Sequence, residues 1–194
     1  MTGRKTLAGR AARVVATLGV AVALAGCAGG QVSQPQTLEA MIASGAGPTL
    51  EMLKKPGPLP ERTMGDPDAP VTVIEYASLT CPYCRRFHAD VFPRFKRNFI
   101  DTGKVHFIYR EFPIGRSAGA AAIAARCVPE EHYFAANWKL LAEQRRWVAQ
   151  QIRYDAIYEV VQEFGLDRAA FDSCMENQPI IEGLKEVKQR GRDL

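Results

Sequence analysis

Two cysteines separated by two residues, Cys81 and Cys84, are the first candidates for chemistry in this chain. The C-x-x-C pattern occurs as a structural disulfide, as half of a metal site and as a redox-active dithiol. Zinc needs further ligands at suitable spacing, and His88 supplies only C-x-x-C-x-x-x-H. A structural disulfide across so short a loop adds little stability. We therefore favour redox chemistry and predict neither a metal nor a cofactor.

The residues around this pair predict a strand followed by a helix. The stretch 71–78, VTVIEYAS, is apolar and β-branched, which is typical of a buried strand in a parallel sheet. Apolar residues then recur every four positions from 83 to 99, which indicates an amphipathic helix that we expect Thr80 to cap and Pro93 to kink. Cys81 would lie at the head of that helix, where unpaired amides and the helix dipole favour a thiolate.

The rest of the chain predicts an α/β fold in two parts. A second strand over 104–113 completes a right-handed βαβ unit within residues 61–113. Residues 114–194 read as a helical lobe, with one helix running from Pro129 through 147, Gly165 as a C-cap and Asp167 as an N-cap. The large aromatic residues of this part are expected in the core of the lobe: Phe134, Trp138, Trp147 and Tyr158.

The N-terminus predicts export. Basic residues precede the uncharged apolar run 14–26, which is too short for a comfortable membrane span and is typical of a secretory signal. Leu24-Ala25-Gly26-Cys27 is similar to the lipobox of bacterial lipoproteins. We therefore predict a lipoprotein-type signal over 1–26, lipidation of Cys27 and a lipid-anchored Pro/Gly-rich linker over 27–60; an ordinary signal cut after Ala25 is the alternative. Either cut places the mature chain outside the cytoplasm, where disulfides persist.

The number of cysteines and the net charge limit the possible disulfides and binding partners. If Cys27 is lipidated, four cysteines remain, and Cys127 and Cys174 fall on different predicted helices. We favour a structural disulfide between them, with two buried free thiols as the alternative. The formal net charge is +4, partly from the extreme N-terminus, and this is too small and scattered to indicate nucleic-acid binding.

The stretch MGDPDAPVTVIEYASLTCPYCRRFHADVFPRF resembles the DsbA-like branch of the thioredoxin fold, and the segments YREFP, AARC and FDSC are also similar to that family. The resemblance runs from about Met64 to Arg192. It implies a thioredoxin-like βαβ unit with a helical insertion, and a periplasmic thiol:disulfide oxidoreductase. Its partners would be exported proteins with cysteines, and a membrane or thiol redox partner that regenerates it. Oxidase, reductase and isomerase activity all stay open.

The resemblance also implies roles for single residues. Cys81 would carry the exposed, attacked sulfur, and Cys84 would be the enclosed resolving thiol. Glu75 matches the family's buried acid, which can exchange protons with Cys84; an edge or solvent-facing strand carboxylate is the alternative. Pro82 and Tyr83 would tune the site, and tyrosine where many DsbA proteins have histidine predicts a less extreme oxidant. His88 reads as an ordinary surface or packed histidine, with modulation of the thiols as the alternative.

The C-terminal part departs from this family. Its members follow the helical insertion with a cis-proline loop and a closing β-hairpin, whereas Pro179 lies in NQPII and precedes a helix-like stretch. We therefore predict a sheet that is incomplete at the C-terminus and leaves the Glu75 strand with an open edge. This departure motivates a second hypothesis, that the chain is a truncated, non-catalytic, lipid-anchored thioredoxin-like protein.

Overall fold

The structure, a computed structural model, describes residue 45 and residues 47–194. The predicted signal peptide, the predicted lipidation site Cys27 and most of the predicted linker lie outside these described residues. Within them, three strands form one sheet in the order β1-β3-β2: β1 (Arg62–Met64), β2 (Val71–Ala77) and β3 (Val105–Glu111). No helix in this part of the chain is both long enough and apolar enough to cross a bilayer.

The sheet contains the predicted parallel pair. β2 and β3 run parallel, with Val71 opposite Val105 and Ala77 opposite Glu111, so the two strands end at the same edge of the sheet. β1 pairs antiparallel with the other side of β3. This strand was not predicted, because three residues in a proline-rich stretch show no alternation. β2 is an edge strand among the described residues. The α/β class and the βαβ unit are confirmed.

The connection between the parallel strands is not one continuous α-helix. It consists of α3 (Pro82–Arg86), a π-helical turn η1 (Phe87–Val91), α4 (Phe92–Phe95) and a second π-helical turn η2 (Lys96–Ile100). The Phe92 amide donates to the Phe87 carbonyl, five residues back. This wider turn comes directly before Pro93, which has no amide hydrogen and lies in the first turn of α4. The irregularity expected at Pro93 is therefore a local π-helical turn.

A helical lobe follows the sheet. Its members are α5 (Arg116–Cys127), η3 (Glu130–His132), α6 (Tyr133–Ala142), α7 (Gln144–Trp147), α8 (Tyr154–Val161), η4 (Gln162–Phe164), α9 (Arg168–Met175) and α10 (Gln178–Asp193). Gly165 ends η4 in the left-handed conformation, and the Asp167 side chain accepts from the Ala170 amide, as their predicted capping roles require. The single helix predicted over 129–147 is wrong, since it starts as a 3-10 turn and breaks at Glu143.

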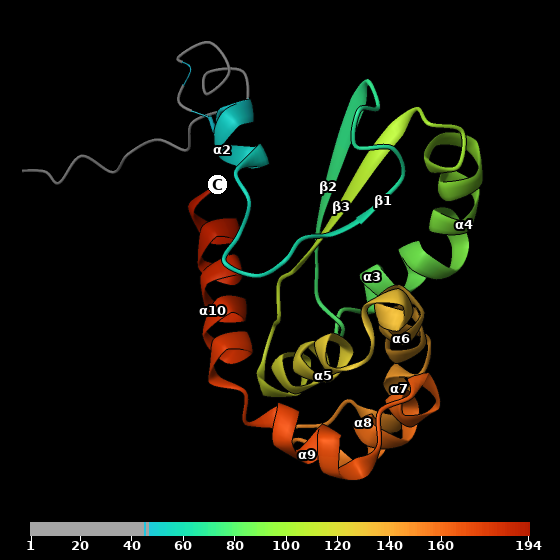
Figure 1. Cartoon of the computed structure of the whole chain (residues 1–194), viewed down its shortest axis with the longest axis vertical. Helices are drawn as coiled ribbons and strands as arrows, with labels where there is room; N and C mark the ends of the chain where they lie inside the picture. The colour runs from blue at the N-terminus through green and yellow to red at the C-terminus, as the bar shows by residue number, and fades with distance from the viewer. Residues whose placement is uncertain (1–44, 46) are drawn as a thin grey trace, which may run out of the picture.

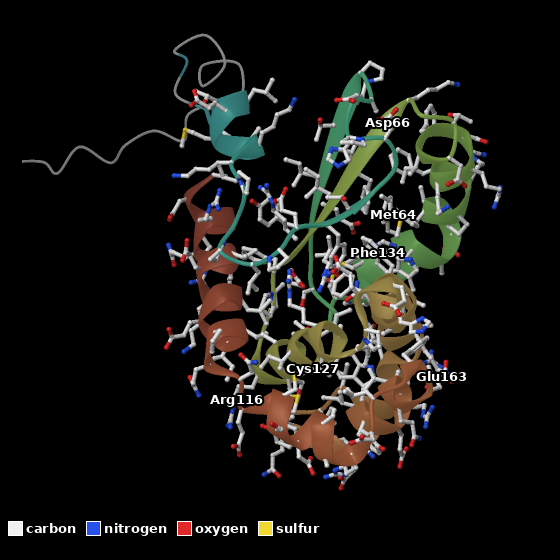
Figure 2. The ribbon with its side chains drawn as sticks, viewed as in Figure 1. Met64, Asp66, Arg116, Cys127, Phe134 and Glu163 are labelled. Carbon is white, nitrogen blue, oxygen red and sulfur yellow. A yellow bond between two sulfur atoms is a disulfide. The ribbon has the colours of Figure 1, made fainter. Side chains whose placement is uncertain are left out.

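The core of the lobe forms around α5, whose alanines let neighbouring helices approach closely. Trp147 is completely buried, whereas Phe134, Trp138 and Tyr158 are partly buried and pack against the core. A disulfide joins Cys127, the last residue of α5, to Cys174 in α9, and it is visible beside the Cys127 label (Figure 2). Figure 1 shows the lobe facing the carboxyl ends of β2 and β3, with α10 on one side of the sheet and α3 and α4 on the other.

Residues 53–61, called the strap below, cross from α2 (Leu50–Lys54) to β1 and are held by three arginines. Arg110 on β3 donates to the Leu53 and Lys55 carbonyls and forms an ion pair with Glu61 at 2.6 Å. Two further arginines reach strap carbonyls, Arg126 from α5 at Pro60 and Arg190 from α10 at Lys55 and Pro56. The strap therefore connects the sheet to both α5 and the end of α10.

Candidate functional site

Cys81 follows the carboxyl end of β2 and is the N-cap residue of α3. Its sulfur accepts the backbone N–H of Cys84 at 3.4 Å, with φ −75° and ψ 120° at the cap. The prediction that Thr80 caps this helix is wrong. The Thr80 hydroxyl instead donates to the Ile114 carbonyl at 3.0 Å. This bond links residues 78–81, called the reactive turn below, to the loop after β3. Pro82 fits the first helical position because no amide hydrogen is needed there.

The two sulfurs of the pair are free thiols in different electrostatic environments. Burial by itself raises the pKa of Cys81, but hydrogen bonds from the Cys84 backbone and thiol and from the Tyr83 backbone lower that pKa below the ordinary cysteine value overall. Burial raises the pKa of Cys84 to about 11, and the charges of Cys81 and Glu75 add to this effect. The pair therefore combines one acidic thiol with one that keeps its proton.

A glutamine from the helical lobe holds the backbone of the reactive turn. The buried Gln144 side chain donates from Nε2 to the Leu79 carbonyl at 2.7 Å and to the Cys81 carbonyl at 3.0 Å. The Ser78 hydroxyl accepts the Ile114 amide at 3.1 Å on the same turn. Sequence reasoning missed Gln144, because a glutamine in the polar run EQRRW resembles any solvent-facing residue.

Glu75 lies behind the cysteine pair and contacts His88. Both of its carboxylate oxygens lie within hydrogen-bond distance of His88 Nε2, at 3.0 and 3.1 Å. The His88 side chain is only 4% exposed and that of Glu75 17%, and the imidazole stacks on Trp138 with ring centroids 4.0 Å apart. Of the surface and packed positions expected for His88, the structure shows the packed one. Its contact with Glu75 was not predicted, because a β-strand and a following helix give no sequence signal for such a pair.

Several of the side chains exposed near Cys81 in the sequence or through contacts are apolar or aromatic. Tyr83 is 76% exposed, Pro82 is also exposed, and Ile114, whose carbonyl binds Thr80, is 58% exposed. Large exposed apolar side chains near a reactive sulfur are suited to contact an extended polypeptide. Within residues 47–194, histidine, cysteine and acidic side chains form no cluster that could hold a metal ion.

A family model described as Thioredoxin matches residues 59–193, which span the sheet, the cysteine pair and the lobe. The chain belongs to the thioredoxin family. Among solved structures, Wolbachia pipientis alpha-DsbA1 is similar with a TM-score of 0.66 and 32% identity, over 75% of this chain and 73% of that one. The DsbA-like branch inferred from the CPYC region is therefore confirmed for this thioredoxin-family chain.

Relatives of this thioredoxin-family chain have names that refer to disulfide chemistry. A "Putative protein-disulfide oxidoreductase" of Rickettsia bellii is 28% identical over 125 residues, which cover 64% of this chain and 48% of that protein. A "Probable disulfide bond formation protein D" of Bacillus anthracis is 24% identical over 142 residues, covering 69% and 64%. The chain spans about half the length of the first of these relatives.

Proposed function

We propose that this chain is an extracytoplasmic thiol:disulfide oxidoreductase that exchanges disulfides with exported proteins through Cys81 and Cys84. The observation that carries the proposal is the asymmetry of the pair at the head of α3. Cys81 accepts an amide hydrogen bond and has a lowered pKa, whereas Cys84 is more buried and has a pKa raised to about 11. Disulfide exchange needs one thiolate that attacks or leaves readily, and a second thiol that stays protonated until it resolves the mixed disulfide.

The reaction starts from the oxidised protein, in which Cys81 and Cys84 form a disulfide. A substrate thiolate attacks the Cys81 sulfur, a mixed disulfide forms, and Cys84 leaves as a thiolate that takes up a proton. A second substrate thiolate then attacks the substrate sulfur of the mixed disulfide, and Cys81 leaves. The substrate loses two electrons and gains a disulfide, while the protein ends as the dithiol state that the structure shows.

The direction of exchange follows from which redox state the site stabilises. A thiolate at Cys81 stabilises the dithiol form, so the disulfide form becomes a better oxidant. Tyr83 cannot carry the positive charge that histidine would, so we expect a moderate rather than an extreme oxidant. We assign Glu75 to proton exchange with Cys84, because its carboxylate lies behind the pair and its charge acts on the Cys84 sulfur.

The place of action and the partners rest on the N-terminal sequence. A signal-like segment over 1–26 and a lipobox-like Cys27 support export and a lipid anchor in the membrane, with periplasmic exported proteins as substrates. After each turnover the dithiol must be reoxidised. We assign this step to a membrane or thiol redox partner, because an external oxidant must take the two electrons that the dithiol holds.

The experiment compares wild type with Cys81→Ser in the catalysed oxidation of a reduced model protein, each supplied with the same excess of oxidised glutathione. We expect the variant to fall to the uncatalysed rate, because the attacked sulfur is gone. Cys127→Ala/Cys174→Ala is the matched control, since it removes sulfur from the protein without touching the reactive turn. Equal rates for wild type and Cys81→Ser would leave the non-catalytic hypothesis in place.

A further inference from the structure

A titratable side chain is buried among aromatic rings directly behind the cysteine pair. The His88 imidazole is 4% exposed, stacks on Trp138 at 4.0 Å and lies 4.7 Å from the Phe92 ring, measured between centroids. A polar ring in such surroundings costs free energy unless it is hydrogen bonded. The Glu75 carboxylate compensates for this burial cost, because both of its oxygens lie within 3.1 Å of His88 Nε2.

This histidine is linked to the resolving cysteine by the helix and by charge. His88 follows Cys84 by four residues, so their side chains lie on the same helix face, one turn apart. Burial raises the pKa of Cys84 to about 11, and the Glu75 charge is among the smaller contributions to that rise. The carboxylate that His88 binds therefore acts electrostatically on the sulfur that must gain and lose a proton.

Only one of the two imidazole nitrogens of His88 has a hydrogen-bond partner among the described residues. Nε2 faces Glu75, whereas Nδ1 is buried and finds no partner among residues 47–194. A neutral imidazole can donate from Nε2 to the carboxylate and keep Nδ1 bare. One further proton, shared between the carboxyl group and the imidazole, makes the two side chains neutral as a whole, which is less costly to bury than a single charge.

We propose that His88 is a positioning residue that acts through Glu75, and that the Glu75–His88 pair, rather than Glu75 alone, exchanges the proton of Cys84. The inference rests on the proposed function. When a substrate thiolate breaks the Cys81–Cys84 bond, Cys84 leaves with the electron pair and takes a proton from the protonated Glu75–His88 pair. The pair is left as carboxylate and neutral imidazole, and it regains the proton when Cys84 is reoxidised.

Few other charges face this pair. The titratable groups shown near His88 are Glu75 on β2, which it contacts, and Tyr109 on β3, whose ring lies 6.3 Å from the imidazole; Cys84 precedes it by four residues on the same helical segment. Burial and nearby negative charges raise the pKa of Tyr109 well above its ordinary value, so it stays neutral. The α6 residue that stacks on His88, Trp138, is uncharged. A pH-dependent component of the rate that wild type shows and the His88 variants lack would therefore report the Glu75–His88 pair.

The test measures the rate of the first exchange step, from oxidised protein to mixed disulfide, as a function of pH in wild type and three variants. His88→Phe keeps an aromatic ring against Trp138 but cannot hold a proton. His88→Gln can donate to Glu75 but does not titrate. His132→Phe makes the same chemical change at an exposed site on the lobe and is the matched control.

We expect the wild-type pH profile to contain a component that is absent in both His88 variants. Their rates at neutral pH should fall about tenfold, less than the loss typical of a group that itself transfers the proton, because Glu75 remains. His132→Phe should match wild type. A rate and profile for His88→Gln equal to those of wild type would overturn the proposal, because that variant retains the hydrogen bond.

A second measurement needs no variant that alters the site. The chain contains three histidines, so the nuclear magnetic resonance titration of each imidazole can be followed in oxidised and in reduced protein. We expect the His88 midpoint to differ between the two redox states, and those of His106 and His132 to stay the same. Identical His88 midpoints would refute the coupling to Cys84. Loss of exchange in Cys81→Ser would in that case still support the proposed function.

Discussion

At the scale of single residues, one backbone hydrogen bond and a difference in burial distinguish two chemically identical thiols. Cys81 occupies the N-cap position and accepts the Cys84 amide, whereas Cys84 lies one turn deeper beside Glu75. The amide and helix terminus stabilise the anion at the first sulfur, and desolvation disfavours it at the second. This difference in position supports the proposed division of roles, with Cys81 as the attacked and Cys84 as the resolving cysteine.

Alkylation of the reduced protein across a pH series tests this asymmetry. Iodoacetamide should modify Cys81 at a pH below the ordinary cysteine pKa of about 8.5, and Cys84 only as the pH approaches about 11. Peptide mapping by mass spectrometry assigns the modified sulfur. Unfolded protein is the control, in which both should react alike. Equal pH profiles for the two thiols in folded protein would contradict the proposed roles.

The same shifts give opposite contributions to the stability of the reduced form. The lowered pKa of Cys81 stabilises the folded dithiol at pH values above the pKa of the thiol in the unfolded chain. This contribution is lost as the pH falls through the lowered pKa. The raised pKa of Cys84 stabilises the folded dithiol at pH values below the pKa of the thiol in the unfolded chain. This contribution is lost as the pH rises toward about 11. The free energy of unfolding of the reduced protein should therefore decline in strong alkali through Cys84.

At the scale of elements, the reactive turn is held by segments from both halves of the chain. Gln144 on α7 binds the Leu79 and Cys81 carbonyls, and Thr80 and Ser78 bind the loop after β3. The turn thus depends on a helix more than 60 residues away in the sequence, since Gln144 and Leu79 are separated by 65 positions. The helical lobe supports the cysteine pair directly.

Gln144→Ala should therefore destabilise the protein by about 1–3 kcal/mol, because buried carbonyl groups lose their donor. The measurement is the free energy of unfolding by urea denaturation. Gln162→Ala is the matched control at an exposed glutamine on η4, and we expect a change within about 0.5 kcal/mol. A Gln144 variant as stable as this control would show that the turn holds its shape without the lobe.

The sequence predicted the elements whose signals are local. The apolar runs gave β2 and β3, the C-x-x-C pair with Pro82 marked the head of α3, and Gly165 and Asp167 marked helix ends. The contacts of His88 and Gln144 could not be predicted, because they join segments that only the folded chain brings together. The three residues of β1 form a strand through their pairing with β3, and that pairing leaves no pattern in so short a stretch.

At the scale of the whole molecule, a buried charge network joins the sheet to the lobe. Glu111 at the end of β3 accepts from Arg126 on α5 at 2.5 and 2.8 Å and from the Tyr133 hydroxyl on α6 at 2.7 Å. The Glu111 and Arg126 side chains are only 3% and 5% exposed. Their mutual orientation therefore fixes how α5 and α6 sit against β3.

Glu111→Gln should reduce the free energy of unfolding by about 3–5 kcal/mol, because Arg126 keeps its charge in a buried position without a counterion. The control is Glu143→Gln, which weakens a surface pair with Arg146 and should change stability by about 1 kcal/mol at most. Chemical denaturation of both variants gives the comparison. Similar losses in the two would show that the buried pair adds no more than a surface one.

The arginine-held strap also decides how the molecule responds to tension. A force applied from the N-terminal side enters the described residues through α2 and the strap, whose carbonyls accept hydrogen bonds from Arg110, Arg126 and Arg190. These bonds distribute the force among β3, α5 and α10, and none of them is made to residues 78–81. Tension that enters through residues 53–61 would therefore act on these elements before it reaches Cys81.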